Sequence, residues 1–299
     1  MKDTQASSTA FTVQQGMIYA GRYSQEKDAI PSNLVSLSEQ IMSALPEGKK
    51  RIDQLKNPLR RGLLKLMEFT LLPGISLHYV LRKMKIEQLA HQAVDDGVEQ
   101  IVVLGAGFDM LATQLAIAHS HLTCIEIDHP ATSIEKRKAI DNCELGQENC
   151  ELIAEDLSKH KLEDVLRNSP NFKSQAKTLY ICEGVLMYLL EKDVCNILTV
   201  IKELSPMGCQ FVFTALEPLK SEKNDAGLLL QMHLRSMSEG LNWMLSSDDI
   251  EEFLNKNNFL LDGTSNDAMI CKELLPSVKP RHLHNGEYVV SAHGSASRA

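Results

Sequence analysis

Two glycines and two acidic residues are the groups in this chain best suited to holding a nucleotide. Gly105 and Gly107 follow one apolar run, and Glu126 and Asp128 lie at the end of the next. A glycine lets the backbone pass close to a ligand at a point where a Cβ would collide with it. An acid at the end of the second strand suits the two hydroxyls of a ribose. The stretch 98–130 therefore predicts a strand–turn–helix–strand unit that binds a nucleotide.

The residues after the second glycine distinguish between two kinds of cofactor. A dinucleotide fingerprint reads G-x-G-x-x-G, and its third glycine position is Met110 here. Asp109 lies where the turn would approach a pyrophosphate, and a carboxylate there would repel phosphate. Both residues favour S-adenosylmethionine, which has no phosphate, over NAD or FAD. Two alternatives stay open: an NAD-dependent oxidoreductase on a Rossmann-type sheet, and a catalytically inactive cofactor-binding fold that serves as an interaction protein.

Composition disfavours several other classes of partner and site. The chain has 299 residues, is 43% apolar and carries a net charge of −8, which disfavours nucleic acid and anionic membranes. No apolar stretch is long and uninterrupted enough to span a bilayer, and the first ten residues do not resemble a signal peptide. The seven cysteines are scattered without a C-x-x-C pair, which indicates reduced residues of a cytoplasmic protein and no metal site. Nothing in the sequence indicates an oligomeric state.

Apolar residues recur at helical spacing through most of residues 9–85, where no strand pattern is visible. One stripe ends at Pro46, and the last covers 77–92. The stripe between them consists of Leu59, Leu63, Leu66 and Met67. We expect residues 1–95 to form a helical cap over one end of a core that covers 96–299. Arg82 lies in the last of these helices, and an arginine at such a position is most often a solvated surface charge.

Seven short apolar runs predict the strands of the core, at 101–104, 122–127, 150–154, 178–182, 210–215, 259–261 and 288–291. The first five alternate with helical patterns, which is typical of a parallel sheet. The last two are expected to pair in antiparallel fashion around a loop with Pro276 and Pro280. An insertion is expected at about 217–245. This layout is that of the class I methyltransferases, an α/β, Rossmann-like, seven-stranded sheet whose last strand is antiparallel.

Further candidate residues follow the third and fourth strands, at the edge where open α/β sheets bind ligands. Asp156 and Leu157 follow the third strand, and Asp156 could either contact a ligand or cap the next helix. Glu183 and Tyr188 follow the fourth strand. Glu183 could neutralise a cationic part of the cofactor, and Tyr188 could direct its hydroxyl at the methyl donor or the acceptor.

Five pieces of the sequence, taken in order, resemble the leucine carboxyl methyltransferase family, specifically its bacterial branch of S-adenosylmethionine-dependent O-methyltransferases. They are LPG at 72–74 followed by Arg82, VLGAGFD at 103–109, EIDHP at 126–130, EDL at 155–157 and EGVLMYL at 183–189. Their order and spacing match over about residues 73–216. One departure lies at Met110-Leu111 and Gln114-Leu115, where family members usually carry Thr-Arg and often Arg-Leu. It puts in doubt any contact that those arginines make, including one to an acidic substrate.

The resemblance implies a role for each matched residue. The implied cofactor contacts are Arg82 for the methionine carboxylate, Gly105 for the turn, Asp128 or else Glu126 for the ribose, Asp156 and Leu157 for the adenine, and Glu183 for the methionine portion. Tyr188 would lie near the transferred methyl group. No metal is implied.

The implied reaction is direct transfer of a methyl group to an oxygen nucleophile. A carboxylate acceptor is ionised at neutral pH and needs no base, whereas a hydroxyl acceptor would want one. The candidate bases are Tyr188, His129 and His233, of which His233 lies in the expected insertion. Family members methylate protein C-termini as well as small metabolites. The acceptor is therefore expected to be either a small molecule or a peptide C-terminus.

Overall fold

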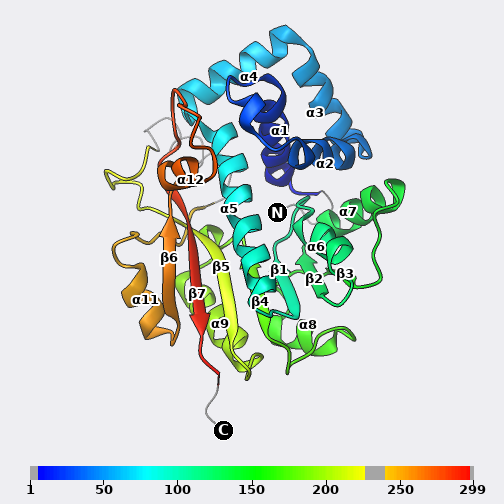
Figure 1. Ribbon diagram of the computed structural model, residues 1–299, viewed down its shortest axis with the longest axis vertical. Coiled ribbons are helices and arrows are strands. Elements are labelled where there is room, and N and C mark those ends of the chain that lie inside the picture. Colours follow the sequence, from blue (N-terminus) through cyan, green and yellow to red (C-terminus); the bar gives the residue numbers. More distant parts are fainter. Residues whose placement is uncertain (1–5, 226–239, 297–299) are drawn as a thin grey trace.

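The computed structural model describes residues 6–225 and 240–296, and its centre is a seven-stranded sheet (Figure 1). The strands are β1 (Gln100–Leu104), β2 (Thr123–Asp128), β3 (Cys150–Ala154), β4 (Thr178–Cys182), β5 (Cys209–Leu216), β6 (Leu260–Ser265) and β7 (Glu287–Gly294). Their order is β3-β2-β1-β4-β5-β7-β6. Strands β1 to β5 are parallel, and β7 is antiparallel to both β5 and β6. The predicted class I sheet and its antiparallel last strand are confirmed.

The central strands are mostly apolar because helices cover both faces of the sheet. In β1, Ile101 and Val103 join one core cluster, and Val102 and Leu104 join another. Successive side chains of a strand point to opposite faces, so each face receives every second residue. A strand buried on both sides reads as a continuous apolar run, which is why these runs predicted the parallel sheet well.

The core helices are α6 (Leu111–Ala118), α7 (Pro130–Asn142), α8 (Leu162–Asn168), α9 (Glu191–Glu203), α11 (Ile250–Lys256) and α12 (Asp267–Leu274). Short 3-10 helices cover Lys27–Ala29 and Leu186–Tyr188. The expected loop around Pro276 is wrong in part, because α12 occupies its first half. Asn266 caps this helix by accepting a hydrogen bond from the backbone N–H of Met269 at 3.0 Å. The sequence did not single out this cap, because Asn266 is one of several consecutive small polar residues that also suit a loop.

Five helices precede the sheet: α1 (Ser8–Tyr23), α2 (Ser32–Ser43), α3 (Pro46–Lys56), α4 (Pro58–Leu71) and α5 (Ile75–Asp95). In Figure 1, α1 to α4 lie beyond the carboxyl ends of the parallel strands, and α5 runs from them down along one face of the sheet. Pro46 was expected to end a helix, but it is also the first residue of α3. Proline fits the first turn of a helix, because backbone N–H groups there have no intrahelical partner and its lack of an N–H costs nothing. The helices thus cover the sheet edge at which a ligand would bind.

The apolar stripe predicted over Leu59 to Met67 belongs to α4 and faces outward. Leu59 is 84% exposed and Leu63 is 59% exposed, and no residue of α4 is buried. Amphipathic spacing predicted the helix correctly but not which surface its apolar face contacts. Within the described ranges, no helix is both long and apolar enough to cross a bilayer. All seven cysteines are free thiols.

Candidate active site

A cavity of about 630 Å³ lies at the carboxyl edge of the parallel strands, between α1, α5, the glycine turn after β1 and the loop after β4. Pockets of about 300–1,000 Å³ are typical of small-molecule sites. Six of the nine site residues predicted from the sequence line it, namely Arg82, Gly105, Gly107, Asp128, Glu183 and Tyr188. The other three, Glu126, Asp156 and Leu157, are not among the described residues that line it.

The glycine turn has a backbone shape that requires its glycines. Gly105 has a φ of +72°, and a Cβ there would lie 2.4 Å from Cγ2 of Val185 in the loop after β4. Any larger residue would therefore be strained and would also push away that loop. Gly107, with a φ of +53°, donates its backbone N–H to Oδ2 of Asp128 at 2.5 Å. The turn and the end of β2 consequently form one unit on the cavity wall.

The two acids of β2 occupy different environments, which separates the two candidates for the ribose. Asp128 faces the cavity and also accepts a hydrogen bond from the backbone N–H of His129 at 2.6 Å. Glu126 lies one pleat deeper, is 3% exposed and pairs with Nζ of Lys136 at 2.5 Å. Burial raises the pKa of each carboxyl group. The backbone hydrogen bonds to Asp128 and the charge of Lys136 beside Glu126 act in the opposite direction but do not cancel this effect. Only Asp128 is placed to meet a ligand in the cavity.

Asp156 closes a turn after β3. Its Oδ1 accepts hydrogen bonds from Oγ of Ser158 at 2.6 Å and from the backbone N–H of Ser158 at 3.0 Å. The Ser158 hydroxyl, more than any other group, lowers the pKa of Asp156 to about 2. The next helix, α8, begins only at Leu162, so Asp156 does not cap it. Leu157 is half-buried and packs against the core cluster on the α8 and α9 side of the sheet.

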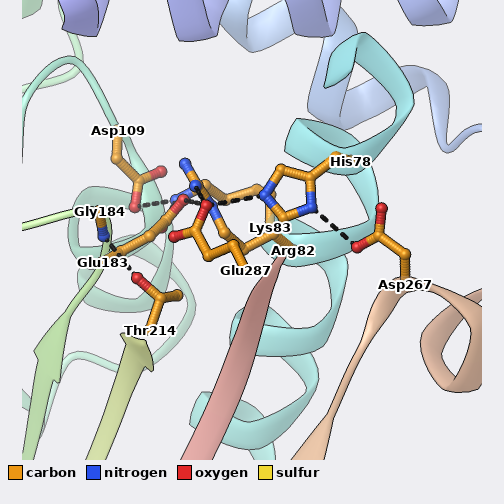
Figure 2. A network of polar contacts seen from close by, with 9 residues as sticks. All are labelled: His78, Arg82, Lys83, Asp109, Glu183, Gly184, Thr214, Asp267 and Glu287. Carbon is orange, nitrogen blue, oxygen red and sulfur yellow. Dashed lines mark hydrogen bonds and ion pairs between the residues drawn. The ribbon is translucent and has the colours of Figure 1, made fainter. Parts of the chain in front are cut away.

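A second part of the cavity wall is a network of buried charges centred on α5 (Figure 2). Arg82 donates from Nε to Glu183 at 2.8 Å and from Nη1 to Glu287, the first residue of β7, at 2.6 Å. Lys83 contacts Glu183 at 2.5 Å and Asp109 at 2.6 Å. Arg82 is only 5% exposed, so its interpretation as a solvated helix charge is wrong. The reason is that three carboxylates from separate strand ends converge on this turn of α5.

The network extends to a second helix through His78. Nδ1 of His78 lies 2.8 Å from Asp267 in α12, and Nε2 lies 2.9 Å from Glu287. Burial alone would lower the pKa of His78, but Asp267 and Glu287 together raise it to about 9. For Glu287, burial alone would raise the pKa, but Arg82 and His78 hold it well below its usual range. At neutral pH the network therefore contains a protonated imidazole between two carboxylates.

Sequence reasoning missed His78, Lys83, Asp267 and Glu287, and it misread Asp109. Asp109 does not present a free charge to a ligand, because Lys83 neutralises it and holds its pKa low against the effect of burial. Its carboxylate is therefore not an argument against a phosphate ligand. One signal in the sequence was available: His78 and Arg82 are four residues apart and lie between apolar residues of α5 that are themselves buried.

The candidate bases fall in three different places. Tyr188 lines the cavity, and its backbone carbonyl accepts a hydrogen bond from Nδ2 of Asn242 at 2.8 Å. His129 is not among the described residues that line the cavity, and its ring caps α7 by accepting from the N–H of Ala131 at 3.3 Å. His233 lies outside the described residues. Met110, which replaces the third glycine, is buried against α1 to α3.

Comparisons with known proteins agree with this geometry. A Bacillus subtilis protein named "Putative S-adenosyl-L-methionine-dependent methyltransferase YktD" is 25% identical over 179 residues, which are 58% of this chain and 58% of that protein. A protein of the same description from Streptomyces coelicolor is 28% identical over 141 residues, 47% of this chain and 49% of that protein. The chain thus spans about half the length of the curated relatives it matches.

A solved structure and a family model complete the comparison. The crystal structure of a "putative methyltransferase" from Thermobifida fusca has a TM-score of 0.56 at 16% identity, and the match covers 86% of this chain and 94% of that one. This likeness shows a shared fold. The model of the leucine carboxyl methyltransferase family matches residues 32–202, which is more than half of the chain. The chain belongs to the leucine carboxyl methyltransferase family.

Proposed function

We propose that this protein transfers a methyl group from S-adenosylmethionine to an oxygen atom of an acceptor bound in the same cavity. The observation that carries the proposal is the pairing of two cavity walls. Asp128 and the glycine turn form one wall, and Arg82 with its carboxylate partners forms the other. A nucleoside with an amino-acid tail needs both, a hydroxyl-binding carboxylate for the ribose and a charged cluster for the tail.

Each end of the cofactor has suitable groups in the cavity. Asp128 would accept hydrogen bonds from the ribose hydroxyls. Arg82 uses Nε and Nη1 within the network, and no hydrogen bond among the described residues uses its Nη2, which lies 3.8 Å from the Cβ position of Gly184. That nitrogen would hold the methionine carboxylate. Glu183 would attract the ammonium group, and Asp156 with Leu157 would frame the adenine.

The charge of the cavity also fits a cationic ligand. Among the described residues, four acids line it, Asp109, Asp128, Glu183 and Glu287, against two cations, Arg82 and Lys83. S-adenosylmethionine supplies an electrophilic methyl group on a sulfonium, and the whole molecule carries a net positive charge at neutral pH. The chain's own contribution is to hold donor and acceptor in line and to exclude water, with Tyr188 beside the reacting groups.

The two alternatives make different demands on the fold. A dinucleotide oxidoreductase would need a third glycine to open α6, whereas Met110 occupies that position, directly before the helix, and is buried in the core. The antiparallel β7 is also typical of methyltransferases. An interaction protein without catalysis would keep the cofactor cavity but transfer no methyl group. The acceptor class is a carboxylate or a hydroxyl, carried by a small molecule or a peptide C-terminus.

Calorimetric titration with S-adenosylmethionine, S-adenosylhomocysteine and NAD tests the cofactor assignment. We expect both sulfur nucleosides to bind and to raise the free energy of unfolding by about 2.7 kcal/mol at a hundred times their dissociation constant. Stabilisation by NAD alone would contradict the proposal. Deuteriomethyl-labelled cofactor, incubated with acceptor panels and read by mass spectrometry, then tests transfer. Cofactor binding without any labelled product would favour the interaction protein.

A further inference from the structure

His284 brings an imidazole to the cavity wall beside the start of α5. It lies three residues before β7, lines the cavity and is 7% exposed. The stretch before it packs against the turn between α4 and α5, where a Cβ on Gly74 would lie 3.0 Å from the backbone nitrogen of His284. Gly74, with a φ of +82°, permits that approach. The fold thus fixes this residue beside the start of α5.

The ring of His284 has polar atoms that no described residue satisfies. Its Nδ1 is buried without a hydrogen-bond partner among the described residues. Its Nε2 likewise makes no hydrogen bond to a described residue. Within the described ranges, its ring contacts that of His78 edge-on, with the centroids 4.8 Å apart. A buried polar group without a partner costs about 1–3 kcal/mol, and native proteins contain few of them. Such a group on a cavity wall points to a ligand.

The charged groups that face His284 come from three elements. They are His78 and Arg82 in α5, Asp267 in α12 and Glu287 in β7. Burial first, and then the positive charge of His78, lower the pKa of His284 to about 4, against the effect of the two carboxylates. At neutral pH the ring is uncharged and has one donor nitrogen and one acceptor nitrogen.

Among the described residues, the same network leaves no cation available to pair with a carboxylate acceptor. The ammonium group of Lys83 is engaged by Asp109 and Glu183, and two of the three guanidinium nitrogens of Arg82 are engaged by Glu183 and Glu287. A second anion in this cavity would meet excess negative charge at low dielectric. A neutral hydroxyl carries no such penalty, and it can pair with a neutral imidazole as donor or as acceptor.

We propose that His284 is a specificity-determining residue of the acceptor subsite and that the acceptor is a neutral, hydroxyl-bearing, largely apolar molecule such as a phenol. Tyr79, Leu72 and Ile75, which line the cavity beside it, supply an apolar and aromatic wall for the rest of that molecule. The inference rests on the proposed function, because it assigns the cofactor to the glycine turn, Asp128, Arg82 and Glu183 and leaves the wall around His284 to the acceptor.

Matched probes in complexes with S-adenosylhomocysteine test this inference. 2-Naphthol and 2-naphthoate have similar size and differ mainly in charge. By calorimetry, we expect the naphthol to bind the wild-type complex about tenfold more tightly than the naphthoate, and His284→Phe to remove about that much affinity, the effect of one lost hydrogen bond to a buried group. His293→Phe is the control, because His293 lies on the surface of β7 and pairs with Asp262. It should change neither affinity.

A second measurement does not depend on the folding of any variant. In wild-type protein with labelled histidine, NMR should show His284 still uncharged at about pH 6, and its ring signals should shift when 2-naphthol is added. Equal or tighter binding of 2-naphthoate, unchanged naphthol affinity in His284→Phe, or no naphthol binding at millimolar concentration would each overturn the inference. If S-adenosylhomocysteine itself does not bind, the proposed function fails, and this inference fails with it.

Discussion

The two walls of the cavity are held in place by different kinds of interaction. The glycine-turn wall consists of backbone conformations and one carboxylate, Asp128, which accepts backbone N–H groups. The α5 wall is a set of buried ion pairs between residues up to 209 positions apart, as for His78 and Glu287. Backbone hydrogen bonds satisfy the first wall without any other side chain, whereas each member of the second depends on the charge of its partners. Loss of a single side chain should therefore affect the two walls very differently.

Removal of Arg82 should have the largest effect, because Glu183 and Glu287 would then be left as buried anions without their main partner. Breaking a buried pair in this way typically costs about 3–5 kcal/mol. We expect Arg82→Ala to lower the free energy of unfolding by that amount in urea denaturation and to abolish cofactor binding. Arg82→Lys keeps the charge but cannot bridge both carboxylates, so we expect an intermediate loss.

The control for Arg82 is an arginine–glutamate pair of similar length on the surface. Arg22 and Glu39 lie 2.7 Å apart, and their side chains are 37% and 32% exposed. Exposed pairs of this kind contribute about 0–1 kcal/mol. Arg22→Ala should therefore cost little. If the two substitutions cost the same, the ion pairs of the α5 wall are not the stabilising feature that the geometry indicates.

The protonation of His78 should make the free energy of unfolding decrease at alkaline pH. The folded protein holds the pKa of His78 at about 9, above the ordinary value of 6.5. Its stabilising contribution is therefore complete below about pH 6.5 and is lost as the pH rises through 9. The loss should reach about 3 kcal/mol, and urea denaturation between these pH values would measure it.

A substitution identifies the group responsible for that pH dependence. In His78→Gln the decrease between about pH 6.5 and 9 should disappear, because glutamine does not titrate. His284 has the opposite sign, since its folded pKa of about 4 lies below the ordinary value, so its stability contribution grows as the pH rises from 4 to 6.5. The two windows do not overlap. If the free energy of unfolding of His78→Gln still decreased as much at alkaline pH, another group would be responsible for the decrease.

The same contrast explains which parts of the molecule the sequence could predict. Apolar runs predicted the strands because β1 and β4 are buried on both faces, and Gly105 and Asp128 were recognisable because their role depends on near neighbours in the chain. Glu287 carries no local signal. It is one acid at the start of a strand, and its importance comes from the α5 residue opposite it. A pairing between α5 and β7 depends on the tertiary fold, which spacing within one segment does not encode.

The environment of a polar residue was equally hard to predict. Arg82 and Arg22 are both helical arginines, but three-dimensional packing makes one 5% exposed and leaves the other at the surface. The stripe on α4 is the reverse case, because its apolar spacing is regular and yet no described element covers it. Periodicity predicts that a helix has two faces, while burial of either face depends on elements that are distant in the sequence.

The two acids of β2 allow a sharper test within the first wall. Asp128→Asn removes the charge on the cavity side, and we expect the free energy of binding S-adenosylhomocysteine to become less favourable by about 1–2 kcal/mol, with little change in stability. Glu126→Gln should do the reverse, because it leaves Lys136, which is 1% exposed, without its carboxylate. Calorimetry and urea denaturation on both variants measure the two effects. A loss of affinity confined to Glu126→Gln would exchange their roles.

The smallest expected effect concerns Asp156, which belongs to neither wall. Its carboxylate closes a turn with Ser158, and replacement by alanine should cost about 1 kcal/mol of stability because one charged hydrogen-bond acceptor is lost. If Asp156 also holds the adenine amino group, affinity should fall about fivefold for S-adenosylhomocysteine and remain unchanged for homocysteine, which lacks the base. Ser158→Ala separates the two roles, because it weakens the turn and leaves the carboxylate in place. Equal losses of affinity in both variants would mean that Asp156 acts only through the turn.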